Sequence, residues 1–434
     1  MTADPSAPAA PAEVLVVGAD LLGAGRADLL IRDGRFADPA TVGAGAERVD
    51  ADGLVALPGL VDLHTHLREP GREDAETVQT GTAAAARGGF TAVLAMANTN
   101  PVTDTAEAAE HVAGLGLRGG LAQVVPVGAV SKELAGEQLA ELGLMARSSA
   151  AVRVFSDDGH CVSDARLMRR ALEYVRAFDG VIAQHAQDPR LAGRDACCHE
   201  GELSGRLGLP GWPAVAESTV VARDVQLAEL TRSRLHVCHV SSAETVDVLR
   251  WAKARGIAVT AEVTPHHLLL TTDAVAGYDP TYKVNPPLRP DEHVTALREA
   301  LADGTIDAVA TDHAPHARHD KEHAFAEAAF GMLGLETALA VVLETMVVPG
   351  RLGWGEVAER TSVVPARIAR LAGQGRPLAV GEPANLTLVD PAARAVVDRE
   401  TSASLSRNNP WHGRDLPDPV VATFWAGRAT YRLS

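Results

Sequence analysis

Apolar runs of strand length alternate with amphipathic segments of helix length through the middle of the chain. The strand-like runs lie at 57–64, 91–97, 122–129, 152–155, 180–185, 234–240, 258–263 and 308–311. Helical patterns between them include 73–87, 165–177, 243–254 and 289–301. Strands that alternate with crossover helices form a parallel sheet, and eight such units can close into a barrel. The pattern therefore predicts an α/β fold, a (β/α)8 barrel of the TIM type, over residues 57–375.

Both ends of the chain show a different pattern, in which short strands are separated by turns. These strands are expected at 13–17, 27–32, 34–36 and 48–50, and again at 385–389, 396–397, 420–426 and 428–433. Because neither end has enough residues for a free-standing domain, we predict that residues 13–56 and 376–434 together form one small β-sandwich. Residues 1–12 are rich in Ala and Pro and lack the regions of a signal peptide, so they are predicted to be a flexible tail.

Composition and charge narrow the class of protein. Of the 434 residues, 46% are hydrophobic and 22% are charged, which is typical of a soluble globular protein. The formal net charge of -16 argues against a nucleic-acid or membrane partner, because both would require a basic surface. The four cysteines are too few for a disulfide framework, and no apolar run is long enough to span a membrane. We therefore expect a cytoplasmic protein.

Residues that bind metal ions gather at the ends of the predicted strands. The first strand ends in His64 and His66, which should project to the same face because side chains alternate along a strand. Further candidates follow the fourth, fifth, sixth and eighth strands: Asp157, Asp158, His185, His239 and Asp312. Strand ends form the catalytic face of a barrel, and His and Asp there are typical of a hydrolase whose metal activates water. The alternative is that these polar residues merely end buried strands. That alternative would not explain why so many His and Asp residues lie on one face.

Other histidines have other interpretations. His236 and His239 share a strand at odd spacing, so they are predicted to point to opposite faces, with His239 at the metal site. His266, His267 and His313 are predicted to support the ligands or to pack. The histidines in loop or helix contexts are predicted to be solvated: His199, His293, His319 and His323.

Three motifs occur in order along the chain, HTHLREPG at 64–71, NTNP at 98–101 and DHAPH at 312–316. Together they resemble dihydroorotase, and in particular the bacterial class whose two metal ions are bridged by an aspartate. This family belongs to the amidohydrolase superfamily of metal-dependent barrels. The His-x-His pattern alone marks only the superfamily, whereas the first two motifs together are more specific. The similarity runs from about Val14 to Leu433.

The resemblance implies two zinc ions per chain, held by His64, His66, Asp158, His185, His239 and Asp312. Asp158 is expected to bridge the two ions, with Asp157 as the alternative bridge. Many members of the superfamily instead bridge their metals with a carboxylated lysine at the end of the fourth strand. None of the four lysines of this chain lies there, which independently favours an aspartate.

Arg68 indicates the class of substrate. Its planar guanidinium suits a carboxylate, although a surface salt bridge is the alternative. The resemblance implies that Asn98 and His316 bind the same carboxylate and that Asn285 contacts the ring amides. The full set of substrate-binding residues implied by the resemblance is His66, Arg68, Asn98, Asn285, His316, Phe330 and Gly331, with the last two acting through their backbone.

The implied reaction is the reversible cyclisation of N-carbamoyl-L-aspartate to L-dihydroorotate and water, in de novo pyrimidine synthesis. Zinc-bound hydroxide would attack the ring carbonyl, with Asp312 as the general acid and base. The resemblance also leads us to expect a homodimer, and it leaves an association with aspartate transcarbamoylase open. One alternative is another cyclic amidohydrolase, an allantoinase or a dihydropyrimidinase. Arg68 and Asn98 argue against it, because neither of those substrates carries a free carboxylate. The other alternative, a non-catalytic partner of the transcarbamoylase, conflicts with the complete ligand set.

Overall fold

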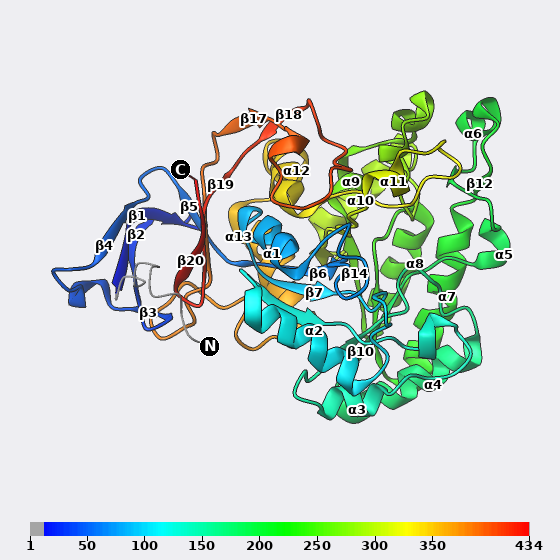
Figure 1. Cartoon of the computed structure of the whole chain (residues 1–434), viewed down its shortest axis with the longest axis horizontal. Helices are drawn as coiled ribbons and strands as arrows, with labels where there is room; N and C mark the ends of the chain where they lie inside the picture. The colour runs from blue at the N-terminus through cyan, green and yellow to red at the C-terminus, as the bar shows by residue number, and fades with distance from the viewer. Residues whose placement is uncertain (1–12, 434) are drawn as a thin grey trace.

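The computed structural model describes residues 13–433, which form a barrel surrounded by helices and a separate sheet at one end of the molecule (Figure 1). The predicted tail at residues 1–12 lies outside the described residues. Among the described residues, no helix combines the length and apolar character needed to cross a bilayer.

Eight parallel strands form the barrel: β6 (Leu60–Thr65), β7 (Phe90–Ala95), β8 (Gln123–Pro126), β9 (Val154–Phe155), β10 (Val181–Gln184), β13 (Arg234–Val237), β14 (Val259–Val263) and β15 (Ala308–Val309). Hydrogen bonding orders them as β6-β7-β8 and β9-β10-β13-β14-β15. Two parallel bridges join these sheets, Gly128 to Phe155 on one side and Thr65 to His313 on the other. The ring is therefore closed, and the predicted barrel is confirmed.

The barrel interior is a packed core. Small and aliphatic side chains from successive strands fill it, among them Leu63, Leu94, Val127, Ala183 and Ala310. Val364 and Ile368 from α14 (Val364–Ile368) join the same cluster.

Helices cover the outside of the ring: α1 (Val78–Arg87), α2 (Ala106–Gly119), α3 (Leu142–Arg147), α4 (Ala165–Val175), α7 (Val215–Thr231), α8 (Ala243–Ala254), α10 (Asp291–Asp303) and α12 (Ala338–Val342). Side-chain caps fix where several of them begin. The hydroxyl of Thr77 accepts a hydrogen bond from Thr80 N–H, so α1 begins at Val78 rather than at the predicted residue 73. Residues 66–77 are thereby left as a loop on the catalytic face.

Shorter elements lie in the connections: α5 (Pro189–Ala192), α6 (Glu202–Leu207), α9 (Pro265–Leu269), α11 (Arg318–Lys321), α13 (Trp354–Ala358), β11 (Cys198–His199) and β12 (Gly211–Trp212). Segments of 3-10 helix lie at Pro39–Thr41, Lys132–Leu134, Arg176–Phe178, Thr272–Gly277, Pro280–Tyr282, Leu335–Thr337 and Arg399–Thr401. Segments of π-helix lie at Leu343–Val347 and Glu359–Val363.

Strands from both chain ends pair in one eight-stranded sheet: β1 (Glu13–Leu21), β2 (Arg26–Arg32), β3 (Arg35–Ala37), β4 (Glu47–Asp50), β5 (Val55–Pro58), β16 (Leu386–Val389), β19 (Val420–Trp425) and β20 (Arg428–Arg432). The two ends meet where β5 runs antiparallel to β16. Apolar residues from both ends share one cluster, which includes Val16, Ile31, Leu386 and Phe424. The segment predicted at 396–397 instead belongs to a separate pair, β17 (Arg394–Val396) with β18 (Asp415–Pro417).

The predicted strand at 57–64 is in fact divided between the two sheets at Gly59. The chain passes so close to Thr91 there that a Cβ atom on Gly59 would lie 2.3 Å from Thr91 Cγ2. The backbone polar groups of Gly59 bond to Asn385 O (3.0 Å) and to the hydroxyl of Ser362 (2.7 Å). Both halves of the run are apolar because both are buried, so hydrophobicity alone did not show the break.

Candidate active site

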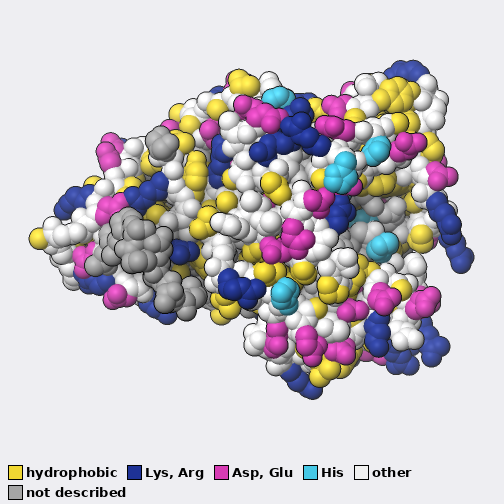
Figure 2. Space-filling view, in the orientation of Figure 1, with side chains coloured by type: hydrophobic (Ala, Val, Ile, Leu, Met, Phe, Trp, Pro, Cys, Tyr) yellow, Lys and Arg dark blue, Asp and Glu magenta, His cyan; other side chains and the backbone are white. Residues whose placement is uncertain are grey.

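The residues predicted for the site converge at the carboxyl ends of the barrel strands. A cavity of about 200 Å³ there is lined by His66, Arg68, Asn98, Asp158, His185, Asn285, Asp312, His316, Phe330 and Gly331. His64 and His239 are almost fully buried, and their imidazoles lie 5.1 Å apart between ring centroids. On the molecular face shown in Figure 2, Lys and Arg side chains are interspersed with Asp and Glu.

Asp158 lies between two pairs of imidazoles. Its Oδ2 atom is 3.3 Å from Nε2 of His64 and 3.3 Å from Nε2 of His66. Its Oδ1 atom is 3.1 Å from Nδ1 of His185 and 3.1 Å from Nε2 of His239. One carboxylate thus presents a different oxygen to each pair, which is the arrangement expected of a ligand that bridges two ions.

Asp157, the alternative bridge, is held elsewhere. Its Oδ1 atom accepts hydrogen bonds from the backbone N–H groups of Val130 (2.8 Å) and Ser131 (2.9 Å), and its Oδ2 accepts one from the Ser131 hydroxyl. These contacts fasten the end of β9 to the loop after β8, and they leave Asp158 as the carboxylate that faces the imidazoles.

The residues present fit a metal ion. Nε2 of His64 is buried and makes no hydrogen bond within the described part of the chain, although an unpaired buried nitrogen is costly. Asp312 Oδ1 lies 3.1 Å from Nε2 of His66 and 3.6 Å from Nε2 of His64. Four ligands at about 2.0–2.1 Å from a tetrahedral ion lie about 3.3 Å from one another, so these spacings match a ligand set. His64 belongs to groups able to hold a metal together with His66 and Asp312, and with Asp158 and His239.

Hydrogen bonds on the far side of three imidazoles fix which nitrogen faces the cluster. His64 donates from Nδ1 to Glu262 (2.9 Å), and His66 donates from Nδ1 to the Asn98 side-chain oxygen (2.9 Å). His185 donates from Nε2 to the Gln187 side-chain oxygen (2.9 Å). In each ring the other nitrogen is the one turned toward the carboxylates. It can hold a proton in the metal-free cluster, and once deprotonated it would offer its lone pair to a metal ion.

Charge within the cluster stabilises the ionised carboxylates. Burial alone would raise the pKa of Asp158, but the charge on His64 and hydrogen bonds from His185 and His239 lower it well below the usual value. Burial also opposes the ionisation of Asp312, and again the charge on His64 and the hydrogen bond with His66 lower the pKa. Both groups are therefore anionic at neutral pH and suited to a divalent cation.

Arg68 and His316 line the wall opposite the imidazole cluster. Arg68 donates from Nε to Pro315 O (3.0 Å), and burial lowers its pKa to about 10, so it stays cationic at neutral pH. His316 lies with Nε2 only 2.6 Å from Phe330 O. Burial and the charges of Arg68 and Lys321 hold the pKa of His316 well below its usual value, so the ring is neutral and its proton is on Nε2.

This protonation state leaves one donor of Arg68 without an acceptor among residues 13–433. Nη2 of Arg68 lies 3.3 Å from Nε2 of His316, but both groups are donors, so they cannot bond to each other. A carboxylate placed between Arg68 and Asn98 would supply an acceptor. The partly buried donors of Arg68 and Asn98 therefore favour an anionic ligand.

Asn285 and Gly331 complete the cavity. Asn285 donates to the side-chain oxygen of Gln187 (2.9 Å), while its own side-chain oxygen is buried without a partner among the described residues. Gly331 has φ +132°, and a Cβ there would lie 2.6 Å from the Cβ of Ala314. The side chain of Phe330 lies away from this point, beneath the Lys283 ammonium at 4.3 Å, so residues 330–331 offer backbone to the cavity.

Two predictions about histidines are wrong. His236 and His239 do not point to opposite faces, because β13 ends at Val237 and His239 has φ +33°, which breaks the strand alternation. His236 bonds inside the barrel to Glu262 (2.9 Å), the residue that also orients His64. His293 is buried rather than solvated, and its Nδ1 accepts a hydrogen bond from Ala243 N–H (3.0 Å).

Glu262 and Gln187 are supporting residues that the sequence reasoning missed. Burial opposes the ionisation of Glu262, but the charge and hydrogen bond of His236 outweigh it and lower the pKa of Glu262 to about 2. The available signal was a lone charged residue, the glutamate, inside the mostly apolar strand at 258–263. Gln187 lies in a loop, where no comparable pattern marks it.

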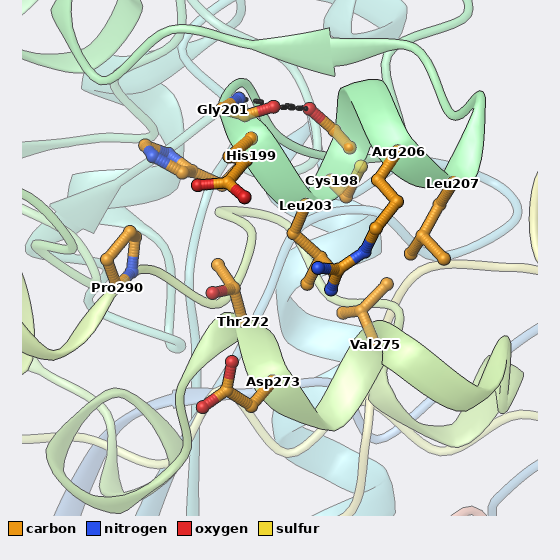
Figure 3. Close-up of a pocket in the computed structure, with 12 residues that line it drawn as sticks. Cys198, His199, Gly201, Leu203, Arg206, Leu207, Thr272, Asp273, Val275 and Pro290 are labelled. Carbon is orange, nitrogen blue, oxygen red and sulfur yellow. Dashed lines mark hydrogen bonds between the residues drawn. The ribbon is translucent and has the colours of Figure 1, made fainter.

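A second cavity, of about 290 Å³, lies outside this cluster (Figure 3). It separates α6 from the 3-10 segment Thr272–Gly277, with Leu203 and Arg206 on one side and Asp273 on the other. His199 lines it and accepts a hydrogen bond from buried Arg289 (2.9 Å). None of the residues predicted for the site lines this cavity.

The closed barrel and the buried His and Asp cluster at its catalytic face define a hydrolase of the amidohydrolase type, with residues able to hold metal. Residues 53–245 match a family model described as Dihydro-orotase-like. A dihydroorotase of Streptomyces coelicolor is 60% identical over 96% of this chain and 98% of its own length. One of Mycobacterium tuberculosis is 55% identical over 96% and 98%. The chain belongs to the dihydroorotase family.

Solved structures support the fold assignment. An L-hydantoinase (dihydropyrimidinase) from Arthrobacter aurescens is 25% identical and covers 96% of each chain with a TM-score of 0.84. A dihydropyrimidinase from Brevibacillus agri NCHU1002 is 22% identical and covers 97% of this chain and 95% of its own, also with a TM-score of 0.84.

Proposed function

We propose that the chain interconverts N-carbamoyl-L-aspartate and L-dihydroorotate. The observation that carries this proposal is the pair of donors formed by the partly buried Arg68 guanidinium and the Asn98 amide, which faces the imidazole and carboxylate cluster across one small cavity. A ring substrate with a carboxylate satisfies both sides of such a cavity. Dihydropyrimidines and allantoin carry no carboxylate, and they would leave the partly buried Arg68 guanidinium without an anion.

We further propose that the centre holds two zinc ions. His64, His66 and Asp312 would hold one, His185 and His239 the other, and Asp158 both. When bound, the ions would polarise the amide carbonyl and make water nucleophilic at neutral pH. The proposal rests on the spacing of the ligand atoms and on the unpaired nitrogen of His64.

Asp312 is proposed as the proton carrier. In hydrolysis, the oxygen of water bonds to the ring carbonyl carbon, the ring C–N bond breaks, and Asp312 moves the proton from the water to the departing nitrogen. Cyclisation reverses each step, with Asp312 protonated at the start. The position of Asp312 supports this role, because it lines the cavity and also lies 3.1 Å from His66.

The remaining chain residues bind and orient the substrate. Arg68 and Asn98 hold the carboxylate, and Asn285 and the backbone of residues 330–331 hold the ring amides. The unpaired side-chain oxygen of Asn285 is suited to accept from a ring N–H.

A comparison of four substrates tests the proposal. Initial rates are measured with L-dihydroorotate, N-carbamoyl-L-aspartate, dihydrouracil and allantoin on zinc-loaded protein, and metal content is determined in parallel. We expect turnover of the first two only. Faster turnover of dihydrouracil or allantoin would replace this proposal with a neutral-ring amidohydrolase.

We also propose that the protein is cytoplasmic and that it forms a homodimer. The homodimer rests on the family resemblance, and the cysteines support the cytoplasmic location. All four cysteines are free thiols, and burial raises the pKa of Cys161, Cys198 and Cys238 to about 12, so these thiols are unreactive. Light scattering of the purified protein, alone and mixed with aspartate transcarbamoylase, measures both the homodimer and the association that the sequence left open.

A further inference from the structure

A segment near the end of the chain lies against the catalytic loops although it belongs to neither the barrel strands nor their helices. Residues 402–411 connect β17 to β18, in the orange and red part of the chain beside α12 (Figure 1). The loops that it touches follow β6 and β15, and these loops carry Arg68 and His316 respectively.

Asn408 is the residue of this segment that reaches the cavity wall. Its Nδ2 donates to Ala314 O (2.9 Å) and Gly331 O (3.1 Å), and its Oδ1 accepts from His316 N–H (3.2 Å). Its backbone oxygen accepts from Leu333 N–H (3.0 Å). The side chain is buried, and both amide hydrogens and the amide oxygen are used.

These bonds join two loop segments that together form the substrate end of the cavity. Residues 313–316 and 330–333 run side by side, with Ala314 N–H bonded to Met332 O (2.9 Å). Within this pair, His316 and Gly331 line the cavity, and a Cβ on Gly331 would lie 3.0 Å from Nε2 of His316. Asn408 therefore fixes the separation of the two groups that face the substrate.

The opposite side of the second loop is held by two lysine side chains. Lys283 donates to Ala326 O (2.8 Å) and Ala328 O (2.7 Å), and Lys321 donates to Ala329 O (2.8 Å). The residues just before Asn408 are also fastened, because Leu405 N–H donates to Glu76 (3.0 Å) in the loop after β6. Asn408 thus connects an anchored segment to an anchored loop. Its hydrogen bonds therefore act directly on the positions of His316 and Gly331.

We propose that Asn408 is a positioning residue that sets His316 and Gly331 for the substrate carboxylate and ring. The proposal rests on the proposed function, since it concerns the same cavity. Asn408 touches no reacting atom, and it acts through the backbone of the two residues that it bonds.

Asn409 provides a matched control. It is the same residue type at the next position, with 7% of its surface exposed against 6% for Asn408. Its side-chain oxygen accepts from Trp411 N–H (2.9 Å), within its own segment. Asn408→Ala, Asn408→Asp and Asn409→Ala are compared with the parent for KM and kcat with L-dihydroorotate, for the Kd of orotate, for melting temperature and for metal content. Asn408→Asp is isosteric but turns a carboxylate oxygen toward two carbonyl oxygens, so it removes the donors without leaving a cavity.

We expect both Asn408 variants to raise KM, and the Kd of orotate, by about tenfold or more, with kcat within about threefold of the parent. Asn409→Ala should leave both values within about twofold. A folded, metal-replete Asn408→Asp with the parent's KM would overturn the proposal, as would an equal rise in Asn409→Ala. Failure of both Asn408 variants to fold would also overturn it, because Asn408 would then be a structural residue. The proposed function is tested separately by the rates of the parent protein with the four substrates. The positioning role is tested only by the ratios of KM and Kd between each variant and the parent.

Discussion

Removing the guanidinium of Arg68 is the most direct test of the substrate class. In Arg68→Ala the backbone stays as it is, because φ of +61° is equally unfavourable for arginine and alanine, so the effect comes from the side chain. Its Nη2 group, beside His316, is the donor that has no acceptor in the described part of the chain. A hydrogen bond to a charged group contributes about 1.5–3 kcal/mol, which corresponds to about one to two decades in affinity for a carboxylate substrate.

Two companion variants separate binding from stability. Arg68→Lys keeps a charge but loses the planar fork, so it cannot hold Pro315 O and a carboxylate together, and we expect it to be impaired as well. Arg72→Ala removes a neighbouring arginine that pairs with Asp320 and does not line the cavity. The Arg72 variant should keep the KM of the parent within about twofold.

The assay is the initial rate of L-dihydroorotate hydrolysis over a range of concentrations, with zinc content and melting temperature measured on each protein. We expect Arg68→Ala to raise KM while zinc content stays at the parent value. The loss of the bond to Pro315 O costs about 1–3 kcal/mol of stability, so the melting temperature should fall. If Arg68→Ala hydrolysed dihydroorotate with the parent's KM, the carboxylate reasoning would be refuted and a neutral-ring substrate would become the better interpretation.

Three other predictions address the metals, the proton carrier and the pH dependence. His64→Ala and His185→Ala should each lower the zinc content measured by elemental analysis, and unchanged zinc in both would contradict the ligand assignment. Asp312→Asn should lower kcat by about 10²–10⁴-fold, and a metal-replete variant with near-normal turnover would end the proton-carrier role. Burial and the charge of Lys283 lower the pKa of Lys321 to about 7 in the folded protein, from an ordinary value of 10.5. Between these two pH values the unfolded chain therefore binds more protons at Lys321 than the folded chain does. The free energy of unfolding should rise with pH across that window. Denaturant titrations at pH 7 and 9 measure this rise, and Lys321→Met should flatten it.

The barrel could be predicted because its signal is local and repeated. Each strand is a short apolar run followed by a helical pattern, and every predicted strand has a counterpart in the closed ring. The division at Gly59 could not be predicted, because Leu57 and Leu60 are both fully buried although they belong to different sheets. The hydrophobic pattern reports whether a residue is buried, but it does not report the sheet to which that residue belongs.

Some residues of the candidate site could be found from the strand pattern, and others are seen only in the folded chain. His64, Asp158 and His185 could be found because metal ligands must sit at strand ends. The inward position of His236 could not, because it depends on a left-handed residue at His239 that sequence alternation does not reveal. Asn408 lies almost a hundred residues after His316 and bears no motif, so only the folded chain shows their contact.

The cavity also explains how this chain can share its fold with hydantoinases while its proposed substrate differs. The solved structures align over nearly the whole chain at 22–25% identity, so the barrel and its packing persist through extensive substitution. The groups proposed to choose the substrate lie outside the regular elements. Arg68 has a left-handed backbone beyond the end of β6, and Gly331 lies in a connection held by Asn408 and Lys283. Substitutions in such loops can change the ring that is bound without disturbing the strands that hold the imidazoles, because loop side chains contribute little to the packed core. Arg68 and its neighbours, rather than the barrel, are therefore where a change of substrate within this fold should be sought.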